Sequence, residues 1–160
     1  MTVAKFVRVS VVQYIRDMGD KTGFLPVEEI PLPKRATRGS AGYDFVSPVE
    51  TVIPAGGKAV IPTGIRCKME EGWVLMLFPR SGLGFRHQVR LSNTVGIIDS
   101  DYAFAENEGH IQVSLRNPME KDLVIGKGER FCQGILLPYG QAAEEETFTE
   151  RRGGMGSTGA

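Results

Sequence analysis

The strongest chemical signal in the sequence is the segment 96–102, GIIDSDY, which places two carboxylates and a phenol ring directly after an apolar pair. A carboxylate held at the end of an apolar strand, as Asp99 would be, can act as a general base. The ring of Tyr102 can pack against a flat or sugar-like ligand. Taken alone, the segment fits an acidic turn at the end of a strand equally well.

A second segment joins three groups that can hold phosphate oxygens. Arg80, Ser81 and Gly82 follow the apolar run 73–78 after a single proline. A guanidinium, a hydroxyl and a flexible backbone N–H at the end of a strand can all donate to phosphate. An ordinary turn after a strand would have the same composition, so this segment alone does not decide the function.

The glycine-rich segment 153–159, GGMGSTG, matches the spacing of a dinucleotide-binding fingerprint. That fingerprint needs a helix after its glycines, and here the sequence stops at Ala160, so we do not expect dinucleotide binding. No lysine follows the glycines, as a P-loop would require. Composition alone favours a mobile terminus, although the neighbouring Arg151 and Arg152 would suit a segment that closes over a phosphate-bearing ligand.

Other catalytic and metal chemistry is not supported by the spacing of the reactive residues. Neither His87 nor His110 has a partner at metal-ligand spacing, so we expect each to be a surface or structural histidine. Ser81 has no convincing His/Asp arrangement, which argues against a nucleophilic serine. Cys67 and Cys132 form no CxxC pair and are expected to be buried free thiols rather than zinc ligands.

The overall composition limits the partners. The 160 residues fit one domain, and 19 basic and 19 acidic residues give a formal net charge of zero. This balance gives no electrostatic case for binding nucleic acid or a membrane surface. We see no signal peptide or membrane-spanning run, so the expected compartment is the reducing cytoplasm.

Short apolar runs between glycines and prolines predict many β-strands. The run 73–78 is continuously apolar and predicts a strand buried on both faces, whereas 111–116 alternates cleanly. Pro62 predicts a strand that is interrupted or lies at a sheet edge. The segments expected to form strands are 7–12, 58–65, 73–78, 111–116 and 131–137, the last ended by Pro138.

The remaining segments complete an all-β interpretation. No long segment shows a capped 3.6-residue period, which favours a sandwich or barrel. Residues 17–34 are interpreted as a polar excursion before the main body, and 144–146 as a solvated acidic stretch. We expect one β-barrel domain over 1–150 and a flexible glycine-rich arm over 151–160.

Five segments, in order, resemble the motifs of the trimeric deoxyuridine triphosphate nucleotidohydrolase (dUTPase) family. The third motif is matched by Asn93, Gly96, Asp99 and Tyr102 at the family's spacing. The resemblance covers roughly 35–159. The matching segments are 41–45 (AGYDF), 79–84 (PRSGLG), 93–102 (NTVGIIDSDY), 128–133 (GERFCQ) and 153–159 (GGMGSTG).

The resemblance implies a jelly-roll-like β-barrel that assembles as a homotrimer, with each active site built from several subunits. It implies hydrolysis of dUTP to dUMP and pyrophosphate with Mg²⁺ on the triphosphate. Asp99 would be the general base that activates water at the α-phosphorus, and Tyr102 would pack beneath the deoxyribose. Asn93 and the nearby hairpin backbone would read the uracil edge.

The same resemblance carries the other site residues over to this sequence. No side chain is implied to bind the metal directly, and Asp44 would support the site, reaching Mg²⁺ through water. The C-terminal arm would close over the ligand. The implied substrate contacts are Arg80, Ser81, Gly82, Asn93, Gly96, Ile98, Tyr102, Gln112, Gln133, Arg151, Arg152, Met155, Gly156 and Ser157.

The sequence departs from the family pattern in several places. Met155 stands where the family usually has a phenylalanine over the uracil, and Glu150 stands at the usual position of a tail arginine. The segment 103–109 adds about five residues after Tyr102, and we interpret it as a longer polar loop at the barrel rim. Residues 12–34 are also longer than this region usually is in the family.

Two other functions fit the same scaffold. The altered tail motivates a nucleotide-binding regulatory protein without turnover. A dCTP deaminase would need an acidic group placed to protonate the cytosine ring, which the third motif fits less well. A purely structural β-module would have no need for these polar residues together.

Overall fold

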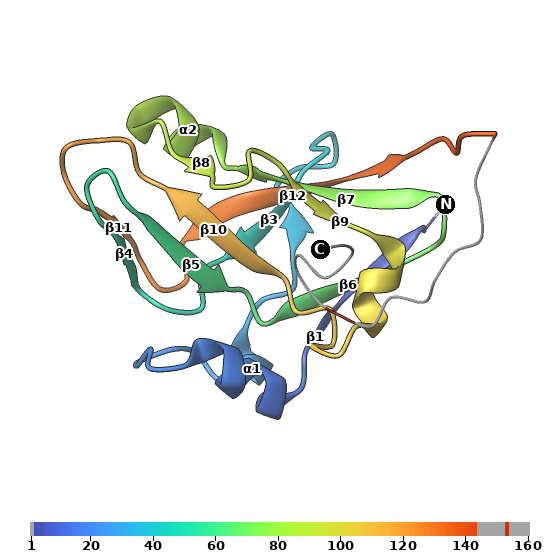
Figure 1. Cartoon of the computed structure of the whole chain (residues 1–160), viewed down its shortest axis with the longest axis horizontal. Coiled ribbons are helices and arrows are strands. Elements are labelled where there is room, and N and C mark those ends of the chain that lie inside the picture. Colours follow the sequence, from blue (N-terminus) through green and yellow to red (C-terminus); the bar gives the residue numbers. More distant parts are fainter. Residues whose placement is uncertain (1, 144–152, 154–160) are drawn as a thin grey trace.

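The computed structural model describes residues 2–143 and residue 153. β-Strands make up most of the regular secondary structure in this part of the chain (Figure 1). In chain order its elements are β1 (Ala4–Arg8), α1 (Val11–Met18), the 3₁₀ turn η1 (Val27–Glu29), β2 (Lys34–Arg35), β3 (Tyr43–Val46), β4 (Thr51–Ile53), β5 (Lys58–Pro62), β6 (Ile65–Met69), β7 (Trp73–Pro79), α2 (Ser81–His87), β8 (Arg90–Leu91), β9 (Gly96–Ile98), the 3₁₀ turn η2 (Ser100–Phe104), β10 (Gln112–Arg116), β11 (Leu123–Ile125) and β12 (Arg130–Pro138).

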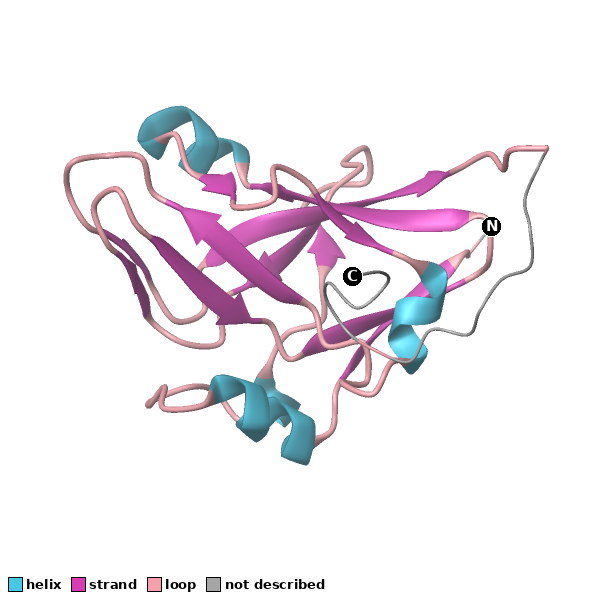
Figure 2. Ribbon diagram, in the orientation of Figure 1, coloured by secondary structure: helices cyan, strands magenta, loops and turns pink. Residues whose placement is uncertain are grey.

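The strands form antiparallel sheets, which Figure 2 shows in magenta. The largest has the order β2-β3-β12-β7-β9, and β12 pairs with β7 from Cys132 opposite Pro79 to Pro138 opposite Trp73. A second sheet has the order β5-β10-β8, and the pairs β1-β6 and β11-β4 complete the set. The predicted all-β fold is therefore confirmed.

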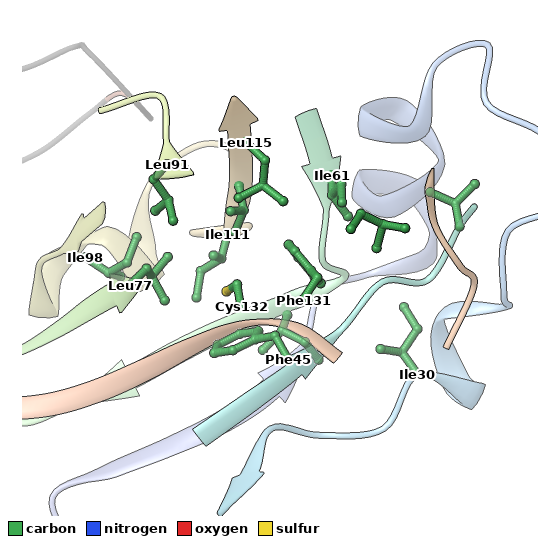
Figure 3. Packing of buried hydrophobic residues seen from close by; sticks show 14 of the residues in the cluster. Ile30, Phe45, Ile61, Leu77, Leu91, Ile98, Ile111, Leu115, Phe131 and Cys132 are labelled. Carbon is green, nitrogen blue, oxygen red and sulfur yellow. The ribbon is translucent and has the colours of Figure 1, made fainter. Parts of the chain in front are cut away.

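The core lies between these sheets. Phe131, Cys132 and Phe45 come from the largest sheet, and Ile61 and Leu115 come from β5 and β10 (Figure 3). Each is at most 1 % exposed. Burying one such Ile, Leu or Phe side chain contributes about 1.5–3 kcal/mol to the stability of the fold.

Close packing in the core requires a glycine at the middle of β12. A Cβ atom on Gly134 would lie 2.7 Å from Leu75 Cδ1 and 3.2 Å from Phe45 Cε2. The first distance is shorter than a normal van der Waals contact, so a side chain here would displace the side chains of Leu75 and Phe45 in the core. Gly134 therefore leaves the space that these two core side chains fill.

Three of the predicted strands are confirmed where the sequence placed them. The run 58–65 is interrupted at Pro62, where β5 ends, and β5 lies at an edge of its sheet. β10 alternates between buried and less buried residues, and β12 ends at Pro138. Among the described residues, no helix is long and apolar enough to cross a bilayer.

The two cysteines are free and buried, as predicted. Burial raises the pKa of the Cys67 thiol to about 12. Burial, together with the charge of Asp44, raises the pKa of the Cys132 thiol as well. Because the thiolate is the reactive form, both side chains act as small apolar groups.

The expected strand over 7–12 is wrong in its second half. β1 ends at Arg8, and α1 begins at Val11. Ser10 is the N-cap of this helix, and its hydroxyl accepts a hydrogen bond from Gln13 N at 3.1 Å. A helix cap at this position stops the strand, so the alternating valines do not continue it.

The interpretation of 17–34 as a polar excursion is also wrong. Met18, Val27 and Ile30 are each at most 4 % exposed and belong to the core. α1 lies against β5 (Figure 1), and Tyr14 on α1 packs edge-on against Phe24. The apolar residues of this region are irregularly spaced, so periodicity could not reveal that they are buried.

The strand over 73–78 exists, but it is not buried on both faces in a single chain. In β7 only Leu75 and Leu77 are fully buried, and their neighbours are half-buried. The core covers one face of this strand, so burial alternates along it although the sequence does not.

A pair of substitutions tests whether the segment before β2 is part of the core. We expect Ile30→Ala to lower the free energy of unfolding by about 2–5 kcal/mol, because it removes a fully buried side chain. Leu32→Ala is the control, because Leu32 is 41 % exposed and should change stability by less than about 1 kcal/mol. Urea unfolding at one fixed protein concentration measures both, and equal effects would contradict the assignment of Ile30 to the core.

Candidate active site

A pocket of about 430 Å³ opens beside the strand β10 and the segment from β8 to β9, whose hairpin turn is closed by an antiparallel bridge between Leu91 and Thr94. It is lined mainly by residues of these three elements. It brings together the sequence-predicted residues Asn93, Gly96, Ile98, Asp99, Tyr102 and Gln112.

The hairpin turn is tight and held by its own backbone. Thr94 N donates to Leu91 O at 3.0 Å, and Val95 N donates to Asn93 O at 2.8 Å. Thr94 has a φ of +70°, a left-handed conformation that is unusual for a β-branched residue. The turn therefore holds Asn93 and its backbone in one arrangement at the mouth of the pocket.

Asp99 stands at the junction of β9 and η2. It is the N-cap residue of the 3₁₀ turn, and its carbonyl accepts from Tyr102 N at 3.2 Å. The carboxylate of Asp99 is solvent-exposed, whereas the Tyr102 side chain beside it is buried. The turn thus places an accessible carboxylate at the rim of the pocket and a ring in its wall.

A second cluster lies where β3, β12 and the end of β7 meet. Asp44 Oδ1 is 3.3 Å from Arg80 Nε, and Asp44 Oδ2 accepts from Arg130 Nη1 at 3.2 Å. Gln133 pairs with Asp44 across β12 and β3, and its Nε2 donates to Pro79 O at 3.3 Å. One carboxylate therefore holds two guanidinium groups at the edge of the sheet.

These phosphate-binding candidates do not share the pocket within one chain. None of Arg80, Gln133 and Asp44 lines it, and neither do Ser81 and Gly82, which begin α2 directly after Arg80. Arg151, Arg152, Met155, Gly156 and Ser157 lie outside the described residues, as does the expected domain boundary at 150. Among the residues that the structure describes, no group of three or more His, Cys, Asp or Glu side chains is placed to hold a metal ion.

Some residues of these clusters were not singled out from the sequence. Ser114 lines the pocket, and its hydroxyl is 2.7 Å from the hydroxyl of Ser92. The strict alternation of β10 was the available signal, because it places Gln112 and Ser114 on one face. Arg130 lies within the matched segment 128–133, but only the structure shows that it shares Asp44 with Arg80.

The family of the chain follows from a comparison with known proteins. The model of the dUTPase family matches residues 28–159. The chain belongs to the dUTPase family. It is 43 % identical over 135 residues to the deoxyuridine 5'-triphosphate nucleotidohydrolase of Lactococcus lactis subsp. lactis, which covers 82 % of this chain and 89 % of the relative. The enzyme of the same name from Dictyoglomus turgidum is 41 % identical over 141 residues, covering 82 % of this chain and 92 % of the relative.

Solved structures of dUTPases share the fold. The dUTPase of Streptococcus mutans superposes with a TM-score of 0.70 at 35 % identity, covering 87 % of this chain and 98 % of that chain. The dUTPase of Staphylococcus bacteriophage 80alpha gives a TM-score of 0.69 at 20 % identity, covering 92 % of this chain and 97 % of that chain. The match to the dUTPase family model begins after α1, so this helix is an addition to the matched region.

The helix α1 contacts a buried histidine, His110, through its residue Asp17. Gly64 N donates to His110 Nε2 at 2.7 Å, so Nδ1 carries the proton and donates to Asp17 Oδ2 at the end of α1. His110 is fully buried. Burial lowers the pKa of His110, although the hydrogen bond and charge of Asp17 and the charge of Glu108 oppose this shift. The neutral imidazole is therefore the form that fits the fold.

Because the imidazole of His110 is buried, we expect the free energy of unfolding to decrease in mild acid. The pKa of His110 is lower in the folded chain than its ordinary value of about 6.5, so unfolding takes up a proton below that pH. We expect the free energy of unfolding to be highest above pH 7 and to fall from pH 7 to pH 5.5, by at most about 1.4 kcal/mol per pH unit for one proton. His110→Gln keeps an acceptor and a donor without titrating, so urea unfolding should show a shallower pH dependence. An unchanged slope would contradict the assignment.

Proposed function

We propose that this chain hydrolyses dUTP to dUMP and pyrophosphate, with Asp99 as the general base that activates water at the α-phosphorus. The observation that carries the proposal is the exposed carboxylate of Asp99 at the rim of a pocket whose wall contains Tyr102. Membership of the dUTPase family, with relatives about 40 % identical, supports this chemistry. A positioned general base typically contributes about 10²–10⁴-fold to a rate.

The pocket suits a deoxyuridine. Asn93 and the rigid backbone of the hairpin would pair with the uracil edge, and Gly96, Ile98 and Gln112 would complete the walls around it. A tight turn rejects the thymine methyl by overlap, and cytosine presents the reversed donor and acceptor. Leaving buried hydrogen-bonding groups unpaired can cost about 10⁴–10⁵-fold in specificity. Tyr102 would pack beneath the deoxyribose and leave no room for a 2'-hydroxyl.

The second cluster suits the triphosphate. Arg80, Ser81, Gly82 and Gln133 would donate to phosphate oxygens, since they combine a guanidinium, a hydroxyl, a backbone amide and a side-chain amide. Asp44 holds Arg80 at 3.3 Å and so fixes the direction of its guanidinium.

Asp44 also bears on the Mg²⁺ that would accompany the triphosphate. Both of its oxygens already contact arginines, so it is placed to reach the ion through water rather than directly. Such an outer contact suits Mg²⁺, which keeps several waters and binds substrate phosphates. The bound ion would offset the negative charge of the phosphates.

The separation of the two clusters supports a homotrimer in which several subunits build each site. Within one chain the predicted phosphate contacts do not line the pocket, so a neighbouring subunit would supply them. The segment after 150 would then close over the bound nucleotide, with Arg151 and Arg152 near the phosphates. Met155, Gly156 and Ser157 would cover the base and its neighbouring groups. The free, buried cysteines suit action in a reducing cytoplasm.

The first test is the release of pyrophosphate from dUTP, dTTP, dCTP and UTP by the wild-type chain and by Asp99→Asn. We expect selective cleavage of dUTP, and a rate lowered by about 10²–10⁴-fold in the variant. Binding of an α,β-imido analogue of dUTP should persist in the variant, because only the base is removed. Tight binding of dUTP without cleavage by the wild type would favour a regulatory protein, and release of ammonia from dCTP would favour a deaminase.

The closing arm has its own test. Deleting residues from Arg151 onward should sharply lower turnover of dUTP while the oligomer measured by light scattering stays intact. Met155→Phe is the matched variant and should preserve or raise the rate, because a ring can stack on uracil where methionine only covers it. A truncated chain that cleaves dUTP at the full rate would rule out a role for the arm.

A further inference from the structure

The loop 103–109, which the dUTPase resemblance does not account for, folds back onto the hydroxyl of the pocket residue Tyr102. It leaves the pocket at Tyr102 and returns to the side chain of the same residue. Asn107 Nδ2 donates to the Tyr102 hydroxyl at 2.9 Å, and that hydroxyl donates to His110 O at 3.0 Å. The sequence predicted a longer polar loop at the barrel rim, and the structure shows in addition that this loop contacts a pocket residue.

We propose that Asn107 is a positioning residue that fixes the ring of Tyr102 and thereby sets the discrimination between dUTP and UTP. The inference rests on the proposed function, in which Tyr102 packs beneath the deoxyribose. Asn107 does not line the pocket itself, so it acts through Tyr102.

The hydrogen bonds of the Tyr102 hydroxyl leave the ring little freedom. A tyrosine hydroxyl has one proton to give, and here His110 O receives it. The amide of Asn107 donates to a lone pair of the same oxygen. A donor and an acceptor with different positions hold the phenol oxygen in place, and the 4 % exposure of the residue shows that packing holds the rest of the ring.

Asn107 is itself held by the loop. Its Oδ1 accepts from Gly109 N at 3.1 Å, which fixes the side-chain amide with its NH₂ group toward Tyr102. Gly109 has a φ of +68°, and a Cβ atom there would collide with the backbone of Tyr102 and Ala103. The loop can close this tightly only because residue 109 is a glycine.

The acceptor on the other side of the hydroxyl is equally fixed. The ring of His110 is fully buried between Gly64 N and the carboxylate of Asp17, so its carbonyl cannot follow a moving tyrosine. Glu108 ties the loop to the start of α1, where its carboxylate accepts from Ser10 N at 2.8 Å. Both partners of the Tyr102 hydroxyl therefore belong to a rigid frame.

This frame has a chemical consequence for sugar selection. A 2'-hydroxyl is excluded by contact with the ring only if the ring cannot tilt away from it. Removing the bond from Asn107 takes away one of the contacts that hold the phenol oxygen. We therefore expect the ring to give way to UTP more readily, with little change for dUTP, which does not press on it.

The test uses Asn107→Asp and Asn107→Ser in the full-length chain. Both retain an oxygen that can accept from Gly109 N, which preserves the turn. An ionised aspartate has no proton to donate to Tyr102, and the single, shorter-reaching oxygen of serine cannot replace the two atoms of the amide. We expect the ratio of kcat/KM for dUTP to that for UTP to fall about fivefold or more, mainly through a lower KM for UTP. Glu106→Gln, an exposed change in the same loop, is the control and should leave the ratio unchanged.

A double-mutant cycle isolates the route through Tyr102. Tyr102→Phe removes the hydroxyl that Asn107 contacts, so Asn107→Ser should change the ratio no further in that background. NMR of ring-labelled tyrosine gives a readout without substrate: the Tyr102 ring should flip faster in the Asn107 variants.

The outcomes separate the two proposals. An unchanged ratio and an unchanged flip rate in folded Asn107 variants would overturn the positioning role. Full additivity of the two substitutions in the cycle would also overturn it, because Asn107 would then act independently of Tyr102. Absence of dUTP cleavage by the wild-type chain would instead refute the proposed function, whatever the ring-flip rate shows.

Discussion

The antiparallel pairing of β12 with β7 is the interaction on which both groups of site residues depend. β12 carries Gln133 and lies between β3, which holds Asp44, and β7, which runs directly into Arg80. On its other side β7 pairs with β9, and β9 leads into Asp99. The pairing of β12 with β7 therefore positions both the second cluster, around Asp44, and Asp99 at the rim of the pocket.

The strand framework and the family motifs could be predicted from the sequence because their signals are local. Alternation along β10 indicates which of its residues are buried, and Pro62 marks the end of β5. The residues from Asn93 to Tyr102 lie close together in the chain, within one hairpin turn, β9 and η2. The residues that face the pocket follow from that spacing. Sharing of Asp44 between two arginines depends on the register of three strands, which no single segment encodes.

The errors arose where distant segments meet. The cap at Ser10 turns a run with strand propensity into a helix, and Glu108 stabilises that cap from the far side of the sequence. Ile30 is buried in the core, although it directly follows Glu28 and Glu29 in the chain. The loop after Tyr102 looks solvent-exposed in composition, yet its partners are a buried histidine and a pocket tyrosine. Tertiary contacts overrode local preference in each case.

The bond between His110 and Asp17 spans 93 positions of the chain, and the one between Glu108 and Ser10 spans 98. Closing loops of that length costs chain entropy before any contact offsets it, so such contacts slow folding and tend to form after local hairpins. Tyr102 in the pocket wall is held by Asn107 and His110, which belong to the same segment as Glu108. During synthesis α1 emerges before Glu108 and His110, so its contacts with these residues cannot form until they have been made. We therefore expect the pocket wall around Tyr102 to form late in folding, together with the contacts of α1 with Glu108 and His110.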